Sequence, residues 1–267
     1  MRKCLYILFC LILTAGVSPA QVIHNGQIPV SKQFNHLYQA CEHGVNYKHH
    51  NKSWAKLAAF IQQQKDKLER SKNQEHFLYL LFYKVHNRFL KNYKQYSHFH
   101  DLAYRGSYDC LTGTLLYGLI LEELGIDYTI RESEYHIYLL VHTPEKQFIF
   151  EATDPISGFV CDQEEVARRE RQFEAYASMT AASPKVSDQY IQYELKTQVF
   201  NQIGMSQLVG LYYYNLAIES FNTQRFQHSS AYMLRGIEYY PSNRMFEFYD
   251  LVVREQARFG LSSQVRK

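Results

Sequence analysis

The segment between residues 110 and 154 most constrains what this chain of 267 residues can fold into. Apolar residues recur with helical spacing from Leu111 to Leu124, and Gly125 is well placed to end that helix in the left-handed conformation. Three stretches rich in aromatic and β-branched residues follow, and such stretches are typical of strands. They comprise residues 128–130, 135–142 and 148–152. A buried helix followed by neighbouring strands predicts an α+β fold.

Two further helices are expected before this segment. Ser53 can cap the first, whose apolar residues continue to Leu68 along one buried face. The second begins near Gln74, and its apolar residues continue to Leu90. The histidines of this region are His76, His86, His98 and His100. Because they have no metal-ligand spacing with cysteine or carboxylate partners, we expect surface or capping positions for them, and neither a metal ion nor another cofactor.

Residues 1–20 have the layout of a cleavable secretory signal. Arg2 and Lys3 precede an apolar stretch from Cys4 to Val17, and small residues end the segment at Ala20. The apolar stretch is too short to span a bilayer comfortably, and an uncleaved anchor is the alternative. We therefore expect a secreted or periplasmic protein without an integral membrane span after cleavage.

Cleavage also sets the charge and the cysteine content of the mature chain. Removing Arg2 and Lys3 lowers the formal charge of +3 by two, to +1, which gives no general electrostatic reason to bind nucleic acid. The cysteines that remain are Cys41, Cys110 and Cys161. An odd number leaves at least one free thiol, for which Cys110 is the candidate, and a Cys41–Cys161 bridge can use the other two.

The C-terminal part is expected to be helical from residue 189 onwards. Before it, Asp162 and Glu165 resemble a capping box at the start of a charged helix, and residues 180–188 are expected to form a loop or linker. Residues 212–241 resemble a tetratricopeptide repeat. The residues that fit its pattern are Tyr213, Leu216, Ala217, Phe226, Ser229, Gly236 and Pro241. A helix over residues 243–259 would be half of a second repeat, so we expect this incomplete array to pack on the preceding part of the chain.

Cys110, His136 and Asp154 form a candidate catalytic triad by residue type and by order. A thiol attacks as its thiolate, and the positive end of the helix that begins at Leu111, together with an imidazole, can lower the pKa of Cys110. Backbone N–H groups at the same helix start can hold the oxyanion of a tetrahedral intermediate. These features predict a nucleophilic cysteine.

The contact between His136 and its carboxylate depends on the register of two strands. If the connection comprises residues 143–147, His136 lies opposite Asp154, at a β-carbon separation of about 5 Å. A connection of one residue less would oppose His136 to Thr153 instead, and it would turn Asp154 to the other face unless the strand ends there. The sequence leaves both registers open.

Residues 104–158 resemble the core of the transglutaminase-like superfamily of papain-like cysteine enzymes. In that core a cysteine opens a helix, a histidine heads a strand and an aspartate closes the next strand. The resemblance implies that Cys110 is the nucleophile, His136 the general base and acid, and Asp154 the residue that orients His136. It also implies a papain-like core of helices and a small antiparallel sheet, with a helical part at 21–100, a catalytic part at 101–178 and a tetratricopeptide-like tail at 189–267.

The function implied is that of a thiol enzyme that forms an acyl-enzyme at a peptide or side-chain amide and passes the acyl group to water or to an amine. Its partner is a protein or peptide substrate, and the C-terminal helices can bind a further protein. Tyr104 and Tyr108 are the candidates for an oxyanion side chain. The alternative is a non-catalytic envelope scaffold that binds a peptide or a partner protein, with Cys110 as a structural residue.

Overall fold

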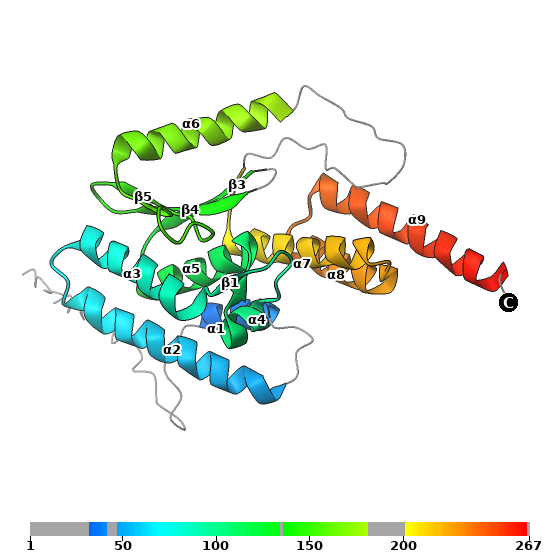
Figure 1. Cartoon of the computed structure of the whole chain (residues 1–267), viewed down its shortest axis with the longest axis horizontal. Helices are drawn as coiled ribbons and strands as arrows, with labels where there is room; N and C mark the ends of the chain where they lie inside the picture. Colours follow the sequence, from blue (N-terminus) through cyan, green and yellow to red (C-terminus); the bar gives the residue numbers. More distant parts are fainter. Residues whose placement is uncertain (1–31, 42–46, 134–135, 181–200, 266–267) are drawn as a thin grey trace, which may run out of the picture.

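The computed structural model describes residues 32–41, 47–133, 136–180 and 201–265 (Figure 1). The expected signal at 1–20 lies outside these residues, and so does all but the first residue of the expected linker at 180–188. The described part of the chain is mixed α+β, with a small antiparallel sheet and C-terminal helices, as the sequence predicts. Within the described ranges, no helix combines the length and apolar character that crossing a membrane requires.

The elements are named in chain order. The helices are α1 (Lys32–Cys41), α2 (Tyr47–Glu69), α3 (Gln74–Phe89), α4 (Phe99–Arg105), α5 (Cys110–Leu124), α6 (Gln163–Thr180), α7 (Met205–Asn222), α8 (Phe226–Tyr239) and α9 (Asn243–Val265). The strands are β1 (Asn92–Tyr93), β2 (Ser107–Tyr108), β3 (Tyr128–Glu132), β4 (Ile137–His142), β5 (Gln147–Phe150), β6 (Phe159–Val160) and β7 (Asn201–Ile203). Strands β1 and β2 form a short parallel pair, and the other five form an antiparallel sheet in the order β6-β5-β4-β3-β7.

Helix α5 is the central element of the fold. It is apolar on nearly all sides, and a helix of that kind is stable only when other elements surround it. It contacts α1, α2, α7 and β4. Gly125 ends it in the left-handed conformation expected from the sequence, with φ 66° and ψ 30°. Gly113 permits a close approach to the chain after β5, because an added β-carbon would lie 2.7 Å from the β-carbon of Ala152.

The antiparallel sheet is covered on both faces, with alternate residues of its central strands on opposite sides. Figure 1 shows α6 over one face and α5 under the other. The residues that join the main core are Leu139, Val141, Phe148 and Phe150. The residues that face the other way are Tyr138, Leu140 and Ile149, which cluster with Val166 of α6. Burial on both faces explains why β4 is a nearly continuous apolar run.

The register of β4 and β5 differs from the one that would pair His136 with Asp154. His142 pairs with Gln147, so the connection comprises only residues 143–146. The backbone N–H of Thr143 donates to the carbonyl of Lys146 at 2.9 Å, which closes this turn. The longer connection is therefore wrong, and β5 ends at Phe150, before either carboxylate that follows it.

Several elements lack a clear local signal and depart from the expectations. Ser53 does not cap a helix, because α2 begins at Tyr47 and Ser53 lies inside it. The expectation that the chain is helical throughout from residue 189 is wrong at β7, which pairs antiparallel with β3. Helix α6 does begin as predicted, since Asp162 accepts a hydrogen bond from the backbone N–H of Glu165 at 2.8 Å.

The C-terminal helices pack on the preceding part of the chain, as expected for an incomplete array. Residues of α7 belong to the same hydrophobic core as α5 and β4. The hydroxyl of Tyr212 accepts a hydrogen bond from the backbone N–H of Phe99 at 3.2 Å, and the hydroxyl of Tyr213 donates to the carbonyl of Ala40. Helices α7 and α8 approach closely at two glycines, because a β-carbon on Gly236 would lie 3.2 Å from the carbonyl oxygen of Gly210.

The close contact at Gly236 makes this position sensitive to size. Gly236→Leu is expected to lower the free energy of unfolding by about 1 to 3 kcal/mol through overpacking, partly offset by the better helix propensity of leucine. The loss should appear in urea as one cooperative transition, because the C-terminal helices share the main core. Leu234→Ala, at an exposed position of α8, is the control and should change the free energy by about 0.5 kcal/mol at most. Two separate transitions would contradict the shared core.

Candidate functional site

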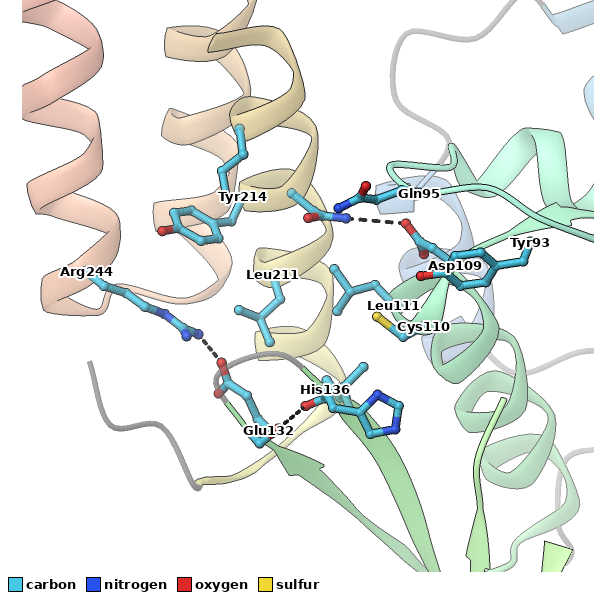
Figure 2. Close-up of a pocket in the computed structure, with 14 residues that line it drawn as sticks. Tyr93, Gln95, Asp109, Cys110, Leu111, Glu132, His136, Leu211, Tyr214 and Arg244 are labelled. Carbon is cyan, nitrogen blue, oxygen red and sulfur yellow. Dashed lines mark hydrogen bonds and ion pairs between the residues drawn. The ribbon is translucent and has the colours of Figure 1, made fainter. Parts of the chain in front are cut away.

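A pocket of about 250 Å³ lies where the start of α5 and the facing ends of β3 and β4 meet helices α7 and α9 (Figure 2). The residues that line it are Tyr93, Gln95, Asp109, Cys110, Leu111, Glu132, Ser133, His136, Ile137, Leu211, Tyr214, Asn215, Ile218 and Arg244. Two of the three residues of the predicted triad, Cys110 and His136, are among them. Asp154 is not.

Cys110 is the first residue of α5, as the sequence predicts. Its side chain is half-buried, and Figure 2 shows the sulfur among the residues that line the pocket, with His136 below it in this view. The backbone groups of Cys110 and Leu111 at this helix start act to lower the pKa of the thiol. The helix start therefore supplies the electrostatic contacts expected for a thiolate.

Asp109 fixes the start of α5 and was not singled out from the sequence. It is the N-cap residue, and its carboxylate accepts hydrogen bonds from the backbone N–H and the hydroxyl of Thr112, both at 2.8 Å. The other carboxylate oxygen accepts from the backbone N–H of Ser97 at 3.1 Å and from the Asn215 side chain at 3.3 Å. This buried group thus joins the loop before α4, helix α5 and α7 around Cys110. The spacing Asp-x-x-Thr was the signal that could have identified it.

The pKa of Cys110 departs from the expectation. Burial raises it to about 12, and the nearby carboxylates of Asp109 and Glu151 act in the same direction. The two backbone N–H groups lower it, but their effect is smaller than that of burial. The prediction that the helix start leaves Cys110 acidified is therefore wrong, and at neutral pH the side chain is a thiol.

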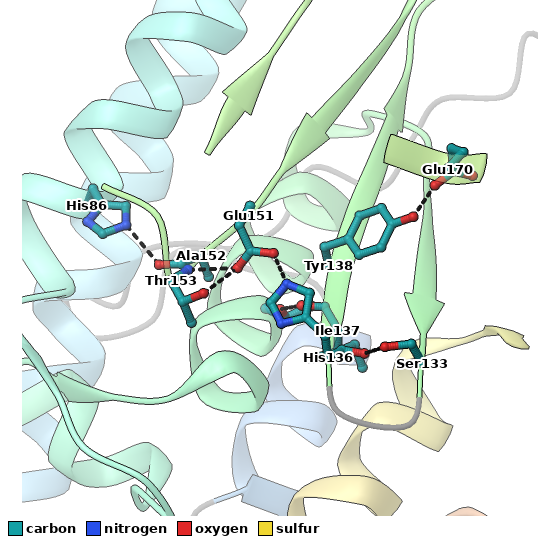
Figure 3. A network of polar contacts seen from close by, with 10 residues as sticks. His86, Ser133, His136, Ile137, Tyr138, Glu151, Ala152, Thr153 and Glu170 are labelled. Carbon is teal, nitrogen blue, oxygen red and sulfur yellow. Dashed lines mark hydrogen bonds and ion pairs between the residues drawn. The ribbon is translucent and has the colours of Figure 1, made fainter. Parts of the chain in front are cut away.

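His136 lies directly before β4 and is held by Glu151 rather than by Asp154. Its Nε2 atom contacts the Glu151 carboxylate (Figure 3). The other Glu151 oxygen accepts hydrogen bonds from the backbone N–H and the hydroxyl of Thr153, at 2.9 and 2.6 Å. The backbone carbonyl of His136 accepts from the backbone N–H and the hydroxyl of Ser133, at 2.8 and 3.0 Å. Both partners of this contact are thus fixed by neighbouring hydrogen bonds.

Asp154 lies in the turn between β5 and β6. Its carboxylate accepts hydrogen bonds from the backbone N–H groups of Ile156 and Ser157, at 3.1 and 2.8 Å. Gly158 closes the turn, because an added β-carbon would lie 2.3 Å from the carbonyl oxygens of both Glu151 and Asp154. In the structure Asp154 is therefore a turn residue. Glu151 makes the contact with His136 that was predicted for Asp154. The shorter of the two connections considered between β4 and β5, with four residues, would have turned Asp154 away from His136.

His86 supports the chain that carries Glu151. Its side chain is buried, which corrects the expected surface or capping position. Its Nε2 atom lies 2.8 Å from the carbonyl oxygen of Ala152, the residue after Glu151 (Figure 3). Because a carbonyl only accepts, Nε2 carries the proton. Burial lowers the pKa of His86, so the imidazole is favoured in its neutral form.

Acidification is therefore expected to destabilise the protein through His86. The pKa of His86 in the folded protein lies below the ordinary value of 6.5, so the unfolded chain takes up its proton first as the pH falls. The stabilisation is complete above the ordinary pKa and is lost as the pH falls through the lowered one.

The measurement is urea unfolding at pH 7.5 and at pH 5.5. His86→Gln should reduce the pH dependence, although His98, whose pKa burial also lowers, should retain part of it. His76→Gln, at an exposed position of α3, is the matched control and should leave the dependence unchanged. An unaltered dependence in His86→Gln would contradict the assignment.

The wall of the pocket opposite α5 comes from the C-terminal helices and the end of β3. Glu132 and Arg244 form a buried ion pair, with side chains 3% and 8% exposed. The hydroxyl of Tyr240 donates to the second Glu132 oxygen at 3.2 Å. The Arg244 guanidinium also lies over the rings of Tyr214 and Tyr240, at 5.7 and 5.5 Å from their centroids. The tail is therefore part of the pocket.

Within the part of the chain that the structure describes, no disulfide joins Cys41, Cys110 and Cys161, so the expected Cys41–Cys161 bridge is absent from the structure. Among the described residues, no three His, Cys, Asp or Glu side chains come together in a way that could hold a metal ion.

The pocket brings together a thiol at a helix start and an imidazole held by a carboxylate. These are the parts that covalent catalysis by cysteine uses. Comparisons with protein-family models, with curated proteins and with solved structures find no match.

Proposed function

We propose that this protein is a papain-like, transglutaminase-like thiol enzyme, secreted or periplasmic, that forms an acyl-enzyme at a peptide or side-chain amide. Cys110 is the nucleophile, His136 the general base and acid, and Glu151 the residue that orients His136. The observation that carries the proposal is that Cys110 and His136 line one pocket while Glu151 binds the ring of His136. Nucleophile, base and orienting group are thus present in one constellation.

The contact with Glu151 favours the tautomer that a general base needs. A carboxylate only accepts hydrogen bonds, so Nε2 of His136 carries the proton in this contact. In the neutral ring the other nitrogen, Nδ1, then has the lone pair. That atom is the one that takes the proton from Cys110, while Glu151 stabilises the imidazolium that forms.

The raised pKa of Cys110 determines how the nucleophile is activated. With a pKa of about 12, the thiol does not ionise in advance at neutral pH. His136 takes the proton as the sulfur attacks the carbonyl carbon, and it later gives the proton to the leaving amine. The resulting thioester is then attacked by water, or by an amine, with His136 again as the base.

Hydrolysis is favoured over transfer to an amine. Transfer requires that water be kept from the thioester. Tyr93, which lines the pocket beside Cys110, is 60% exposed, so water can reach this part of the pocket. The apolar residues Leu211 and Ile218 on the α7 side suit the hydrocarbon part of a peptide side chain.

Acylation by p-nitrophenyl acetate tests the proposal without knowledge of the natural substrate. Mass spectrometry is expected to find the acetyl group on Cys110, with an equal initial release of p-nitrophenolate before the thioester is hydrolysed. His136→Ala should slow this acylation about 10²-fold or more, because the general base is lost. Cys161→Ala is the control, since Cys161 is also a partly exposed free thiol but lies outside the pocket lining. Acylation of Cys110 that is no faster than that of Cys161 overturns the proposal.

A peptide library incubated with methylamine then separates the two outcomes of the acyl-enzyme. Hydrolysis adds water to the acyl product, whereas transfer adds methylamine, and the two products differ in mass. Cys110→Ala should abolish both. This experiment also identifies the class of amide that the enzyme accepts.

A non-catalytic scaffold is the second candidate, and the raised pKa of Cys110 is the observation that favours it. A scaffold would use the same pocket to bind a peptide and would need no activated thiol. In that case His136→Ala would leave the acylation rate unchanged. Peptide binding would be lost only when residues of the pocket wall are substituted. The ester experiment therefore separates the two candidates.

A further inference from the structure

The acyl-transfer chemistry requires a group that stabilises the negative oxygen of the tetrahedral intermediate. Backbone N–H groups at the start of α5, where Cys110 is the first residue, can supply part of this stabilisation. The side chain that completes this oxyanion site is inferred on the basis of the proposed function. Such a side chain must have a hydroxyl or amide group that borders the pocket beside Cys110.

Neither tyrosine expected from the sequence fulfils this condition. Tyr108 is only 4% exposed, and its side chain does not line the pocket. Tyr104 is 54% exposed, but it lies on α4 and outside the pocket lining. A third tyrosine, Tyr93, does line the pocket, together with Cys110.

The short parallel strand pair places Tyr93 next to the nucleophile. Tyr93 pairs with Tyr108, which lies two positions before Cys110. The pairing continues to the next residue, because the backbone N–H of Lys94 donates to the carbonyl of Tyr108 at 2.8 Å. The rings of Tyr93 and Tyr108 pack edge to face with centroids 5.9 Å apart, so a buried ring supports an exposed one. Figure 2 shows the Tyr93 hydroxyl directed over Asp109 and Cys110.

We propose that the Tyr93 hydroxyl donates the side-chain hydrogen bond to the oxyanion formed at Cys110. Among the described residues the Tyr93 hydroxyl has no hydrogen-bond partner, so its proton is available to an incoming substrate. Its pKa is raised by partial burial, and the neighbouring Cys110 and Asp109 groups act in the same direction, so the hydroxyl stays protonated at neutral pH.

The reaction with p-nitrophenyl acetate shows where this donor acts. The sulfur of Cys110 forms a bond to the ester carbonyl carbon as His136 takes the thiol proton, and the electron pair of the C=O bond moves to oxygen. Tyr93 donates to that oxygen. The pair then returns, the bond to p-nitrophenolate breaks, and a thioester remains. Alkylation by iodoacetamide differs, because the sulfur displaces iodide and no oxyanion forms.

The test compares these two reactions in Tyr93→Phe. The acylation rate at saturating ester is expected to fall by about 10-fold or more, below the 10²- to 10³-fold typical of a fully enclosed donor because the ring is exposed. The rate of Cys110 alkylation by iodoacetamide should stay within about 2-fold of the wild type, because that step develops no oxyanion. Tyr104→Phe is the matched control and should leave both rates unchanged. Phenylalanine keeps the ring and its packing on Tyr108, so the variant retains the strand pair.

An unchanged acylation rate in Tyr93→Phe overturns the inference while the proposed function stands. Equal loss of acylation and alkylation also overturns it, because Tyr93 would then act on the thiol rather than on the oxyanion. Loss of acylation in Tyr104→Phe but not in Tyr93→Phe also overturns the inference, because Tyr93 would then not be the donor. Failure of the wild type to acylate Cys110 removes the proposed function and this inference together.

Discussion

Glu151→Gln is expected to slow the acylation of Cys110 by about 10²-fold or more, while the protein stays folded. The amide carries no charge, so the imidazolium of His136 loses its stabilising partner. Its NH₂ group can also donate to the ring, which favours the tautomer with the lone pair on the wrong nitrogen. Both effects weaken His136 as a general base.

The same substitution should act on the thiol in the opposite direction. The Glu151 carboxylate raises the pKa of Cys110, so its removal lowers that pKa and increases the thiolate fraction. Alkylation by iodoacetamide at constant pH should therefore become faster while acylation becomes slower. The two rates, measured by mass spectrometry at Cys110, distinguish loss of the base from general damage to the pocket.

Asp154→Asn is the matched control, because asparagine can still accept the two backbone hydrogen bonds of the turn. It is expected to leave the acylation rate within about 2-fold of the wild type, since Asp154 does not line the pocket. A large loss in Asp154→Asn, with none in Glu151→Gln, would falsify the assignment of Glu151 and restore the triad expected from the sequence.

Arg244→Met is expected to lower the free energy of unfolding by about 3 to 5 kcal/mol. The substitution leaves the Glu132 carboxylate buried without its cation, and the remaining contact to Tyr240 cannot compensate for the charge. Urea unfolding at neutral pH measures the loss.

Two variants show whether the buried charge is the cause. Glu132→Leu combined with Arg244→Met should recover most of the stability, because replacing both charges by apolar groups is often neutral. Arg254→Met, at an exposed position of the same helix, should change the free energy by about 0.5 kcal/mol at most. If Arg244→Met costs no more than Arg254→Met, the ion pair contributes nothing to the packing of α9 on the sheet.

Local patterns predicted the helix that begins at Cys110. The apolar spacing after Cys110 and the glycine that ends α5 both depend on neighbours within the same helix, so the sequence contains them directly. The two central strands were also predicted, because burial on both faces makes them continuous apolar runs. Strand β7 was not, since its three residues pair at the edge of the sheet without an alternating pattern.

A difference of one residue in a turn decided which carboxylate contacts His136. Side chains alternate between the two faces of a strand. A connection that is one residue shorter or longer therefore gives each residue of β5 a different partner on β4. With four residues in the turn, β5 ends earlier, and Glu151 rather than Asp154 meets His136. Sequence patterns around residue 143 do not distinguish a turn of four residues from one of five, and both registers remained open.

The other parts of the site come from contacts that no local pattern records. Asp109 and Asn215 are 106 positions apart, and Glu132 and Arg244 are 112 positions apart. Such pairs depend on how helices from the end of the chain dock on the core. The raised pKa of Cys110 has the same origin, because burial by surrounding elements outweighs the helix start that the sequence shows.

Strand β7 determines how the chain can be divided. It follows residue 200 in the sequence but completes the sheet beside β3, and α7 begins two residues after it. A break in the peptide chain between residues 180 and 201 would leave Cys110 and His136 on one fragment and Arg244 on the other. Neither fragment would contain the whole pocket. The edge of β3 would be exposed on one fragment and β7 on the other until the two fragments associate. The protein is therefore suited to fragment complementation, in which two inactive fragments form the pocket when they associate. It is unsuited to transfer of its C-terminal helices to another protein.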